Sequence, residues 1–344
     1  MIELAEAGAL VRRFRTGVED AAAILADPLI VVDAGSPGDP GKLEIPAGFP
    51  AVVVAACAGS APALAERGPD VALTTASDPP APWVAVPDLT EALAHLGRRV
   101  ASTPKAAVTL ASVLRAGRGR PVEDGLILES LAYSMLQSGP EFALWRAARP
   151  PRPVPAEAEE AVLVERAGGV LEIVLNRPRV HNAYNRAMRD QLCEALAVGA
   201  ADPDLHLLVR GTGPSFCSGG DLDEFGTFPD PVSAHLVRTG RSPARLLHGL
   251  SGRTEVLLHG SCAGSGIELP AFAGRVTARP GTRMWLPELA MGLIPGAGGT
   301  VSVAGRIGPA RTAWMVLTGH PVDERTALRW GLVDVVSEPV ANPA

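Results

Sequence analysis

Four short runs of apolar residues, separated by loops rich in proline and glycine, occupy residues 28–87. The runs are DPLIVVDAG, FPAVVVAA, DVALTTA and WVAVPD. Their shortness, their valine content and the turn residues beside them favour buried strands over helices. The pattern therefore predicts a group of short strands in this part of the chain.

Between residues 88 and 150 the apolar positions follow a helical spacing instead. Three segments carry it, DLTEALAHLGRRVAS, PKAAVTLASVLRAG and VEDGLILESLAYSMLQSGPEFALWRAARPP. Asp88 and the Thr103-Pro104 pair are residues suited to helix starts. The third segment also has a mostly apolar stripe. Its members are Leu126, Ile127, Ser130, Leu131, Ser134 and Met135.

After residue 161 strand and helix patterns alternate. AVLVERAGGVLEIVLNRP has two apolar runs around Gly168-Gly169 and predicts a β-hairpin. NRAMRDQLCEALAVGA places Met188, Leu192 and Leu196 on one helical face. Further short strands are predicted within LHLLVRGTG, EVLLHGSCAGSG, GRVTARP and TRMWLPEL. The alternation predicts an α/β fold.

The run ARPPRPVPAEAEEA separates these two regions. It contains four prolines followed by a cluster of glutamates, a composition typical of linkers. We therefore predict a domain over residues 1–150, a linker over 151–161 and a second domain over 162–344.

Composition narrows the class of protein. The 344 residues are 47% hydrophobic and 20% charged, which is typical of a globular chain. A net charge of -6 argues against a nucleic-acid binder. The four cysteines are scattered without metal-like spacing, so we expect reduced thiols and no metal site. No signal peptide or membrane helix is recognisable, and a soluble, cytoplasmic protein is expected.

Two glycine-rich segments, FCSGGDL (residues 216–222) and HGSCAGSGIEL (residues 259–269), carry the candidate chemistry. Each follows a predicted strand and is expected to lead into a helix, where backbone N–H groups lack helical partners. Two such turns side by side can aim two N–H groups at one oxygen, which is the design of an oxyanion hole. Glycine is needed where a side chain would block the ligand.

Two glutamates accompany these turns, Glu268 in the second turn and Glu288 in the apolar segment WLPELAMGL. Alone, each is better interpreted as a helix-start or salt-bridged carboxylate. Beside an anion-binding site the pair points to proton transfer, because burial raises a carboxyl pKa into the useful range.

The span from about Val162 to Val335 resembles the crotonase (enoyl-CoA hydratase/isomerase) superfamily. LNRPRVHNAYNRAM is similar to its first strand-and-helix signature, and the two glycine-rich segments are similar to its oxyanion-hole turns. PELAMGLIPGAGGT and LTGHPVDERTALRWGLVD resemble the stretches that follow. The resemblance implies a crotonase-like ββα spiral core within the α/β fold, with a helical trimerisation or capping region contributed by the N-terminal half.

The resemblance also implies roles for individual residues. It assigns the oxyanion-hole N–H groups to Gly220 and Ser265, and the acid and base of hydratases to Glu268 and Glu288. Serine replaces the family's usual glycine at position 265 and is expected to narrow the pocket. Five further residues are predicted to bind substrate: Ser218, Gly219, Asp221, Leu222 and Gly264.

Three side-chain types near the turns are expected to be structural or solvated. Asp221 is expected to organise its turn, and Asp223 and Glu224 are expected to be solvated. Structural roles are also favoured for Cys217 and Cys262, since neither has a histidine close in sequence as an obvious base.

Residues 88–150 resemble the helical tail that closes the crotonase chain, including EDGLILE and the final ARPPRP. We interpret the N-terminal half as a degenerate first copy that kept its tail, or as a permuted chain whose helices cap the core. No second active site is expected. In place of the family's tail lysine for the CoA phosphates, Arg115, Arg152 and Arg179 are candidates.

Three functions remain open at this stage. The first is an enoyl-CoA hydratase, a lyase that needs no metal or redox cofactor because coenzyme A is part of its substrate. The second is an isomerase, or an oxygenase acting on an aryl-acetyl-CoA. The third is a catalytically silent acyl-CoA-binding subunit. The presence of both glutamates favours the first. The resemblance further implies a homo-trimer or hexamer whose partner is an acyl-CoA.

Overall fold

The computed structural model describes residues 1–15, 28–149, 152 and 160–337. Apart from Arg152, Glu160 and Ala161, the linker predicted over residues 151–161 lies outside the described residues. None of the helices in these ranges is long and apolar enough to cross a membrane.

A parallel five-stranded sheet in the order β1-β2-β3-β4-β5 forms the N-terminal part. Every residue of β3 and β4 is buried, as expected for valine-rich runs covered on both faces. The four predicted strands are confirmed as β2 to β5. The elements are β1 (Ile2–Glu3), α1 (Leu4–Arg15), β2 (Leu29–Asp33), η1 (Pro40–Lys42), β3 (Val52–Cys57), β4 (Val71–Thr74) and β5 (Val84–Ala85).

The predicted helices follow this sheet, with one more break than expected. Asp88 caps α3, its side chain accepting a hydrogen bond from the Glu91 N–H at 2.9 Å. The third predicted segment divides at Gly139-Pro140, because proline begins a new helix and cannot continue the old one. The helices are α3 (Leu89–Ser102), α4 (Pro104–Gly117), α5 (Val122–Gln137) and α6 (Pro140–Ala148).

The second sheet has six strands in the order β14-β11-β9-β8-β7-β6. Its predicted hairpin is confirmed: β6 and β7 pair antiparallel and turn at Gly168, which has a φ of +57°. The other neighbours run parallel. The strands are β6 (Val162–Ala167), β7 (Val170–Leu175), β8 (His206–Gly211), β9 (Thr254–Leu258), β11 (Arg275–Ala278) and β14 (Val335–Val336).

A small sheet in the order β10-β12-β13 and a set of helices complete this part. The strands are β10 (Ser261–Ala263), β12 (Arg283–Trp285) and β13 (Val322–Asp323). The α-helices are α7 (Arg186–Ala201), α8 (Pro231–Gly240), α9 (Pro243–Gly249), α10 (Ser265–Glu268), α11 (Gly299–Ile307), α12 (Pro309–Thr318) and α13 (Glu324–Trp330). Short 3-10 turns are η2 (Pro178–Val180), η3 (Ser251–Arg253), η4 (Pro270–Phe272) and η5 (Glu288–Met291).

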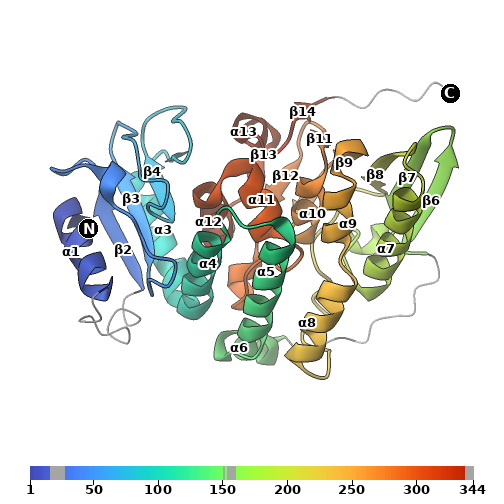
Figure 1. Cartoon of the computed structure of the whole chain (residues 1–344), viewed down its shortest axis with the longest axis horizontal. Coiled ribbons are helices and arrows are strands. Elements are labelled where there is room, and N and C mark those ends of the chain that lie inside the picture. The colour runs from blue at the N-terminus through green and yellow to red at the C-terminus, as the bar shows by residue number, and fades with distance from the viewer. Residues whose placement is uncertain (16–27, 150–151, 153–159, 338–344) are drawn as a thin grey trace.

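The two halves share one hydrophobic core. One cluster of buried apolar residues includes members of β3, β4, α4, β9 and α12. In Figure 1 the N-terminal sheet lies at the left and the six-stranded sheet toward the right, with α5 and α11 between them. Helix α12 packs on α3 and α4, and its Arg311 donates a hydrogen bond to the Trp83 carbonyl at 3.3 Å. The helices of residues 88–150 therefore pack directly against the C-terminal part.

The mostly apolar stripe predicted on α5 is only partly buried. Ile127, Leu131 and Met135 are 47%, 52% and 58% exposed. Two other members of the stripe, Ser130 and Ser134, are buried, as are Glu129 and Tyr133. Polar side chains can occupy these buried positions because they find hydrogen-bond partners inside the molecule.

Candidate active site

The two glycine-rich turns lie side by side and are joined by backbone hydrogen bonds. The Cys217 N–H donates to Ser261 O at 3.3 Å, and the Ala263 N–H donates to Cys217 O at 3.0 Å. Gly219 has a φ of +96°, and an added Cβ would lie 3.1 Å from Ala263 O. Glycine is therefore required here both by the backbone angle and by the close approach of the second turn.

Only the second turn leads into a helix. Gly264, with a φ of +49°, precedes α10, in which Ser265 is the first residue. After the first turn the chain forms bends and turns, and the next helix, α8, begins at Pro231. The expectation that both turns enter helices is thus wrong for the first, where hydrogen bonds to neighbouring segments hold the backbone instead.

Gly220 and Ser265 lie at the wall of one cavity. Both residues line it, and within the described ranges neither N–H donates a hydrogen bond. At Gly220 an added Cβ would meet the Phe225 ring at 2.5 Å, so a larger residue would require that ring to move. The hydroxyl of Ser265 lies 3.8 Å from Cys217 Sγ, so the serine makes a side-chain contact with the first turn.

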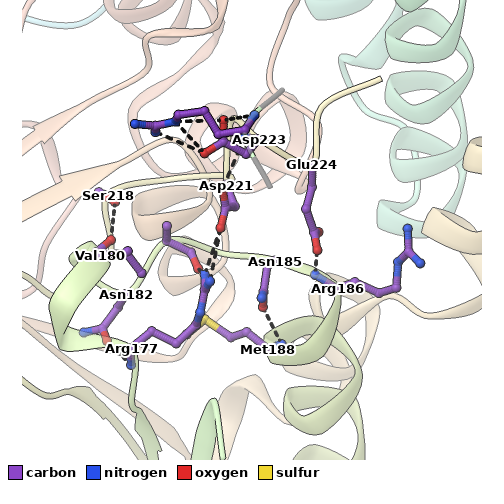
Figure 2. Close-up of polar contacts among 12 residues, drawn as sticks. Arg177, Val180, Asn182, Asn185, Arg186, Met188, Ser218, Asp221, Asp223 and Glu224 are labelled. Atoms are coloured by element: carbon purple, nitrogen blue, oxygen red, sulfur yellow. Dashed lines mark hydrogen bonds and ion pairs between the residues drawn. The ribbon is translucent and has the colours of Figure 1, made fainter. Parts of the chain in front are cut away.

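Side chains from the segment before α7 brace the first turn (Figure 2). The buried Arg177 guanidinium contacts Asp221 Oδ2 through both terminal nitrogens at 3.2 Å. Tyr184 N–H donates to Gly219 O at 2.8 Å, and the Asp221 N–H donates to Tyr184 O at 2.9 Å. These contacts explain how the turn keeps its shape without entering a helix.

Asp223 and Glu224 are engaged rather than solvated, which corrects the sequence expectation. Asp223 forms an ion pair with Arg152 at 3.0 Å. Glu224 accepts a hydrogen bond from the Arg186 N–H at the start of α7, at 2.8 Å (Figure 2). A carboxylate is stabilised there because the first N–H groups of a helix have no intrahelical acceptor.

The cavity has a volume of about 530 Å³. Its walls come from both halves of the chain: α5 and α6 from the N-terminal half, and α7, α8, α9, α10 and the segments 220–221, 224–231 and 296–298 from the C-terminal half. Five aromatic residues are among those that line the cavity. They are Tyr133, Phe142, Tyr184, Phe225 and Phe228.

Glu268 is a buried carboxylate held by backbone donors. Its Oε2 accepts hydrogen bonds from the N–H groups of Ala297 at 2.8 Å and Gly299 at 3.0 Å. Burial raises the pKa of Glu268 to about 7, although these hydrogen bonds favour the ionised form. Glu268 can therefore gain or lose a proton near neutral pH.

Glu288 approaches the same point from η5. A Cβ added to Gly264 would lie 2.7 Å from Glu288 Oε1 and 3.7 Å from Glu268 Oε1, so the two carboxyl groups converge there. Glu288 Oε2 is buried and has no hydrogen-bond partner among the residues that the structure describes. Burial, together with the charge of Glu268, raises the pKa of Glu288 well above its ordinary value.

Glu129, on α5, is a third buried carboxyl group that sequence reasoning missed. It accepts hydrogen bonds from Gly298 N–H at 2.7 Å and from the N–H and hydroxyl of Thr300 at 2.8 and 2.7 Å. The N–H groups of residues 297 to 300 thus alternate between Glu268 and Glu129. Burial, and secondarily the charge of Glu268, raises the pKa of Glu129 to about 8.

A signal for Glu129 was present in the sequence. In GLILESLAY it is a lone carboxylate within an apolar helical run, the same feature that drew attention to Glu288. Its partner segment, however, lies 169 residues further along the chain. Nothing local to α5 indicates that contact.

The other predicted substrate-binding residues lie mostly behind the cavity surface. Asp221 lines it, whereas Ser218, Gly219, Leu222 and Gly264 are absent from its lining. Ser218 is exposed and donates a hydrogen bond to Val180 O at 3.4 Å (Figure 2). These four residues belong to the turns, and their role in binding substrate stays a prediction.

The buried cysteines have the character expected of structural residues. Burial raises the pKa of the Cys217 thiol to about 11 and that of Cys262 well above its ordinary value. Both thiols are therefore kept protonated, which is unfavourable for a nucleophile.

Of the arginines considered for phosphate binding, Arg115 is excluded. It is buried and its Nε donates to Asp70 Oδ1 at 2.7 Å. The cavity itself is lined by another set of arginines. They are Arg186, Arg189, Arg238, Arg241 and Arg245.

The chain is similar to known proteins of one enzyme family. A family model described as enoyl-CoA hydratase/isomerase matches residues 165–341. YhaR of Bacillus subtilis (strain 168), provisionally named as an enoyl-CoA hydratase/isomerase, is 33% identical over 168 residues, which are 48% of this chain and 66% of that protein. The 2,3-dehydroadipyl-CoA hydratase of Escherichia coli (strain K12) is 31% identical over 176 residues, 51% of this chain and 68% of that protein.

Among solved structures, the enoyl-CoA hydratase of Thermoplasma volcanium GSS1 shares 29% sequence identity. The likeness has a TM-score of 0.48 and covers 52% of this chain and 72% of the other. The chain thus spans about two thirds of the length of the two curated relatives above.

Proposed function

The chain belongs to the enoyl-CoA hydratase/isomerase (crotonase) family, and from this premise we propose that it is an enoyl-CoA hydratase. The proposed reaction adds water across the 2,3-double bond of an acyl-CoA thioester. The single observation that carries the proposal is the convergence of Glu268 and Glu288 at Gly264, beside two N–H groups that have no acceptor in the part of the chain the structure describes.

In the proposed mechanism the thioester oxygen accepts hydrogen bonds from the N–H groups of Gly220 and Ser265. These bonds strengthen as negative charge develops on the oxygen when water attacks Cβ, so they stabilise the transition state more than the substrate. A donor of this kind contributes about 3–4 kcal/mol. The turn bracing by Arg177 and Tyr184 keeps the Gly220 donor in place before substrate arrives.

The environments of the two glutamates favour different proton roles. Glu268 accepts two backbone hydrogen bonds, which stabilise its ionised form, so it ionises first and deprotonates the attacking water. Glu288 has no such donors on Oε2 and stays protonated, so it delivers the proton to Cα. Water and proton are thus added by separate residues, and this mechanism requires no metal or redox cofactor.

The partner proposed for the cavity is the acyl-CoA itself. Its arginine-lined wall supports an anionic ligand, because guanidinium groups suit phosphate oxygens. Arg186 stacks over the Phe228 ring at 4.9 Å, which holds one of these cations at the wall.

Assembly into a homo-trimer or hexamer is part of the same proposal. The feature that supports association is an exposed apolar face on two helices that pack together, α5 and α8. Its residues are Ile127, Leu131, Met135, Val232 and Leu236. Light scattering of the purified protein tests this, and a monomer at all concentrations would contradict it.

Hydration is tested by the loss of enoyl absorbance with short, medium and aryl enoyl-CoAs. Glu268→Gln and Glu288→Gln are each expected to lower kcat by about 10²–10⁴-fold, the contribution of a positioned acid or base. Glu165→Gln, a change at an exposed carboxylate on β6, is the matched control and is expected to have no effect.

Isotope-labelled water separates the hydratase from an isomerase. A hydratase incorporates the labelled oxygen at Cβ, whereas an isomerase moves the double bond without oxygen from water. Absence of turnover with every enoyl-CoA would overturn the proposal, and tight acyl-CoA binding without turnover would favour a silent binding subunit.

A further inference from the structure

Arg238, on α8, is a half-buried cation that lines the cavity, and its hydrogen-bond partners among the described residues are all neutral. Its Nη1 donates to Ser130 Oγ at 2.8 Å and to Ser134 Oγ at 3.2 Å. Its Nη2 donates to Gln137 Oε1 at 3.4 Å. All three acceptors are on α5. The guanidinium also stacks over the Tyr133 ring, 4.4 Å from the ring centroid.

Arg115, a buried arginine of the same chain, has an acceptor that Arg238 lacks among the described residues. In Arg115, the Nε and Nη2 edge of the guanidinium binds the two oxygens of Asp70. In Arg238, the Nε–H and one N–H of Nη2 have no acceptor within the described part of the chain. That edge is a planar fork whose geometry matches a carboxylate.

No protein carboxylate neutralises Arg238 within the same residues. Glu129 is close enough to favour the charged guanidinium, but its oxygens already accept the hydrogen bonds of Gly298 and Thr300. Burial lowers the pKa of Arg238, because removing the charged guanidinium from water is unfavourable. An anion entering the cavity would offset that cost.

The position of Arg238 indicates which part of the ligand carries the anion. Arg238 stacks on Tyr133, and a Cβ added to Gly296 would come within 2.6 Å of that ring. The next residue, Ala297, donates its N–H to Glu268. Arg238 is therefore linked through a short series of contacts to the carboxyl groups at the proposed reaction centre. The CoA phosphates are separated from the thioester by the long pantetheine arm, so an anion at Arg238 belongs to the acyl group.

We propose that Arg238 is a specificity-determining residue that binds a carboxylate at the far end of the acyl chain, so that the substrate class is a dicarboxylic enoyl-CoA. This inference rests on the proposed acyl-CoA site. The carboxylate takes the free Nε and Nη2 donors, while Ser130, Ser134 and Gln137 hold the guanidinium in place.

The test compares matched pairs of enoyl-CoAs, one neutral and one ending in a carboxylate, over a series of chain lengths. For the wild type we expect kcat/KM at the best length to be about 10–100-fold higher for the carboxylate form, the range for hydrogen bonds to a charged group. Arg238→Met is expected to abolish this ratio. Arg238→Lys keeps the charge but loses the fork, so an intermediate ratio is expected.

Arg241→Met is the matched control, because Arg241 also lines the cavity but faces Glu194 at 3.9 Å. It is expected to leave the ratio between the paired substrates unchanged. An equal ratio for neutral and carboxylate forms at every length in the wild type overturns the inference. A loss of binding to coenzyme A itself in Arg238→Met also overturns it, because that would identify a phosphate contact.

Calorimetry with saturated acyl-CoAs separates this inference from the hydratase proposal. Saturated dicarboxylic acyl-CoAs cannot be hydrated, yet they are expected to bind the wild type more tightly than their neutral counterparts. Preference in binding without turnover of the enoyl forms would uphold the role of Arg238 and reject the hydratase. Turnover of both enoyl forms without preference would do the reverse.

Discussion

At Ser265 the backbone N–H and the side-chain hydroxyl have different roles. Ser265 is the first residue of α10, so its N–H has no place in the helical hydrogen-bond pattern and is free for a ligand. Its hydroxyl makes only a long contact with Cys217 Sγ. The side chain is thus dispensable in the proposed mechanism, whereas the N–H is not.

Two substitutions at this residue test that division. Ser265→Gly keeps the N–H, and kcat is expected to stay within a few-fold of wild type. Ser265→Pro removes the N–H at a helix position that tolerates proline, and kcat is expected to fall about 10²–10³-fold. Both are measured with the best enoyl-CoA, with thermal unfolding as the check on folding. Equal activity of the two variants would contradict an oxyanion role for this N–H.

At the scale of elements, α5 completes a site whose other parts lie in the C-terminal half. Glu129 and Glu268 together accept the N–H groups of four successive residues, 297 to 300, at the start of α11. Glu268 is therefore positioned by a segment that α5 holds from the other side. The N-terminal half therefore contributes the Glu129 carboxyl group as well as part of the cavity wall.

Glu129→Gln tests whether α5 positions Glu268. The amide has one oxygen and an NH₂ group, so one backbone donor loses its acceptor and the unfolding free energy is expected to fall by about 1–3 kcal/mol. When the 297–300 segment is held less firmly, its N–H groups form weaker hydrogen bonds to Glu268. The pKa of Glu268 then rises, and the acidic limb of the kcat–pH profile moves to higher pH. Asp124→Asn, on the exposed side of α5, is the control and is expected to leave both unchanged. An unshifted profile would reduce Glu129 to a purely structural role.

For the whole molecule, three buried carboxyl groups link stability to pH. Their pKa values in the folded protein lie above the ordinary value of 4.5, at about 8 for Glu129 and about 7 for Glu268, and higher than ordinary for Glu288. The folded state therefore binds more protons than the unfolded chain across this window. Their stabilising contribution is fully present below pH about 4.5 and is lost as pH rises through these values.

We therefore expect the free energy of unfolding to fall between about pH 5 and pH 8, by about 1–3 kcal/mol per pH unit where two groups respond. His259, whose pKa burial lowers, acts in the opposite direction as a single group. Urea unfolding at several pH values measures the slope. The double variant Glu129→Gln with Glu268→Gln is expected to flatten it, and a slope of opposite sign in the wild type would contradict the prediction.

Much of the fold could be predicted because its signals are local. The valine-rich runs of β2 to β5, the hairpin at Gly168 and the capped start of α3 depend on residues a few positions apart. The glycines of the two turns were also recognisable, and the structure explains the one at position 219, where the backbone angle and the approach of Ala263 O favour glycine. The apolar stripe on α5 did not predict which residues of the helix are buried, because periodicity does not show which face of a helix other elements cover.

The sequence by itself indicated β2 to β5, the hairpin of β6 and β7, the helical region of residues 89–148, the two turns and the candidate pair Glu268 and Glu288. These could be recognised because propensity, periodicity and the special conformations of glycine act over short distances. Only the tertiary structure decided that Glu129 joins that pair and that Arg238 has a free fork at the cavity. It also decided that Arg115 is committed to Asp70. The reason is physical: burial, charge neighbours and hydrogen-bond partners come from segments far apart in the chain, and these set both the pKa values and the donors left for a ligand.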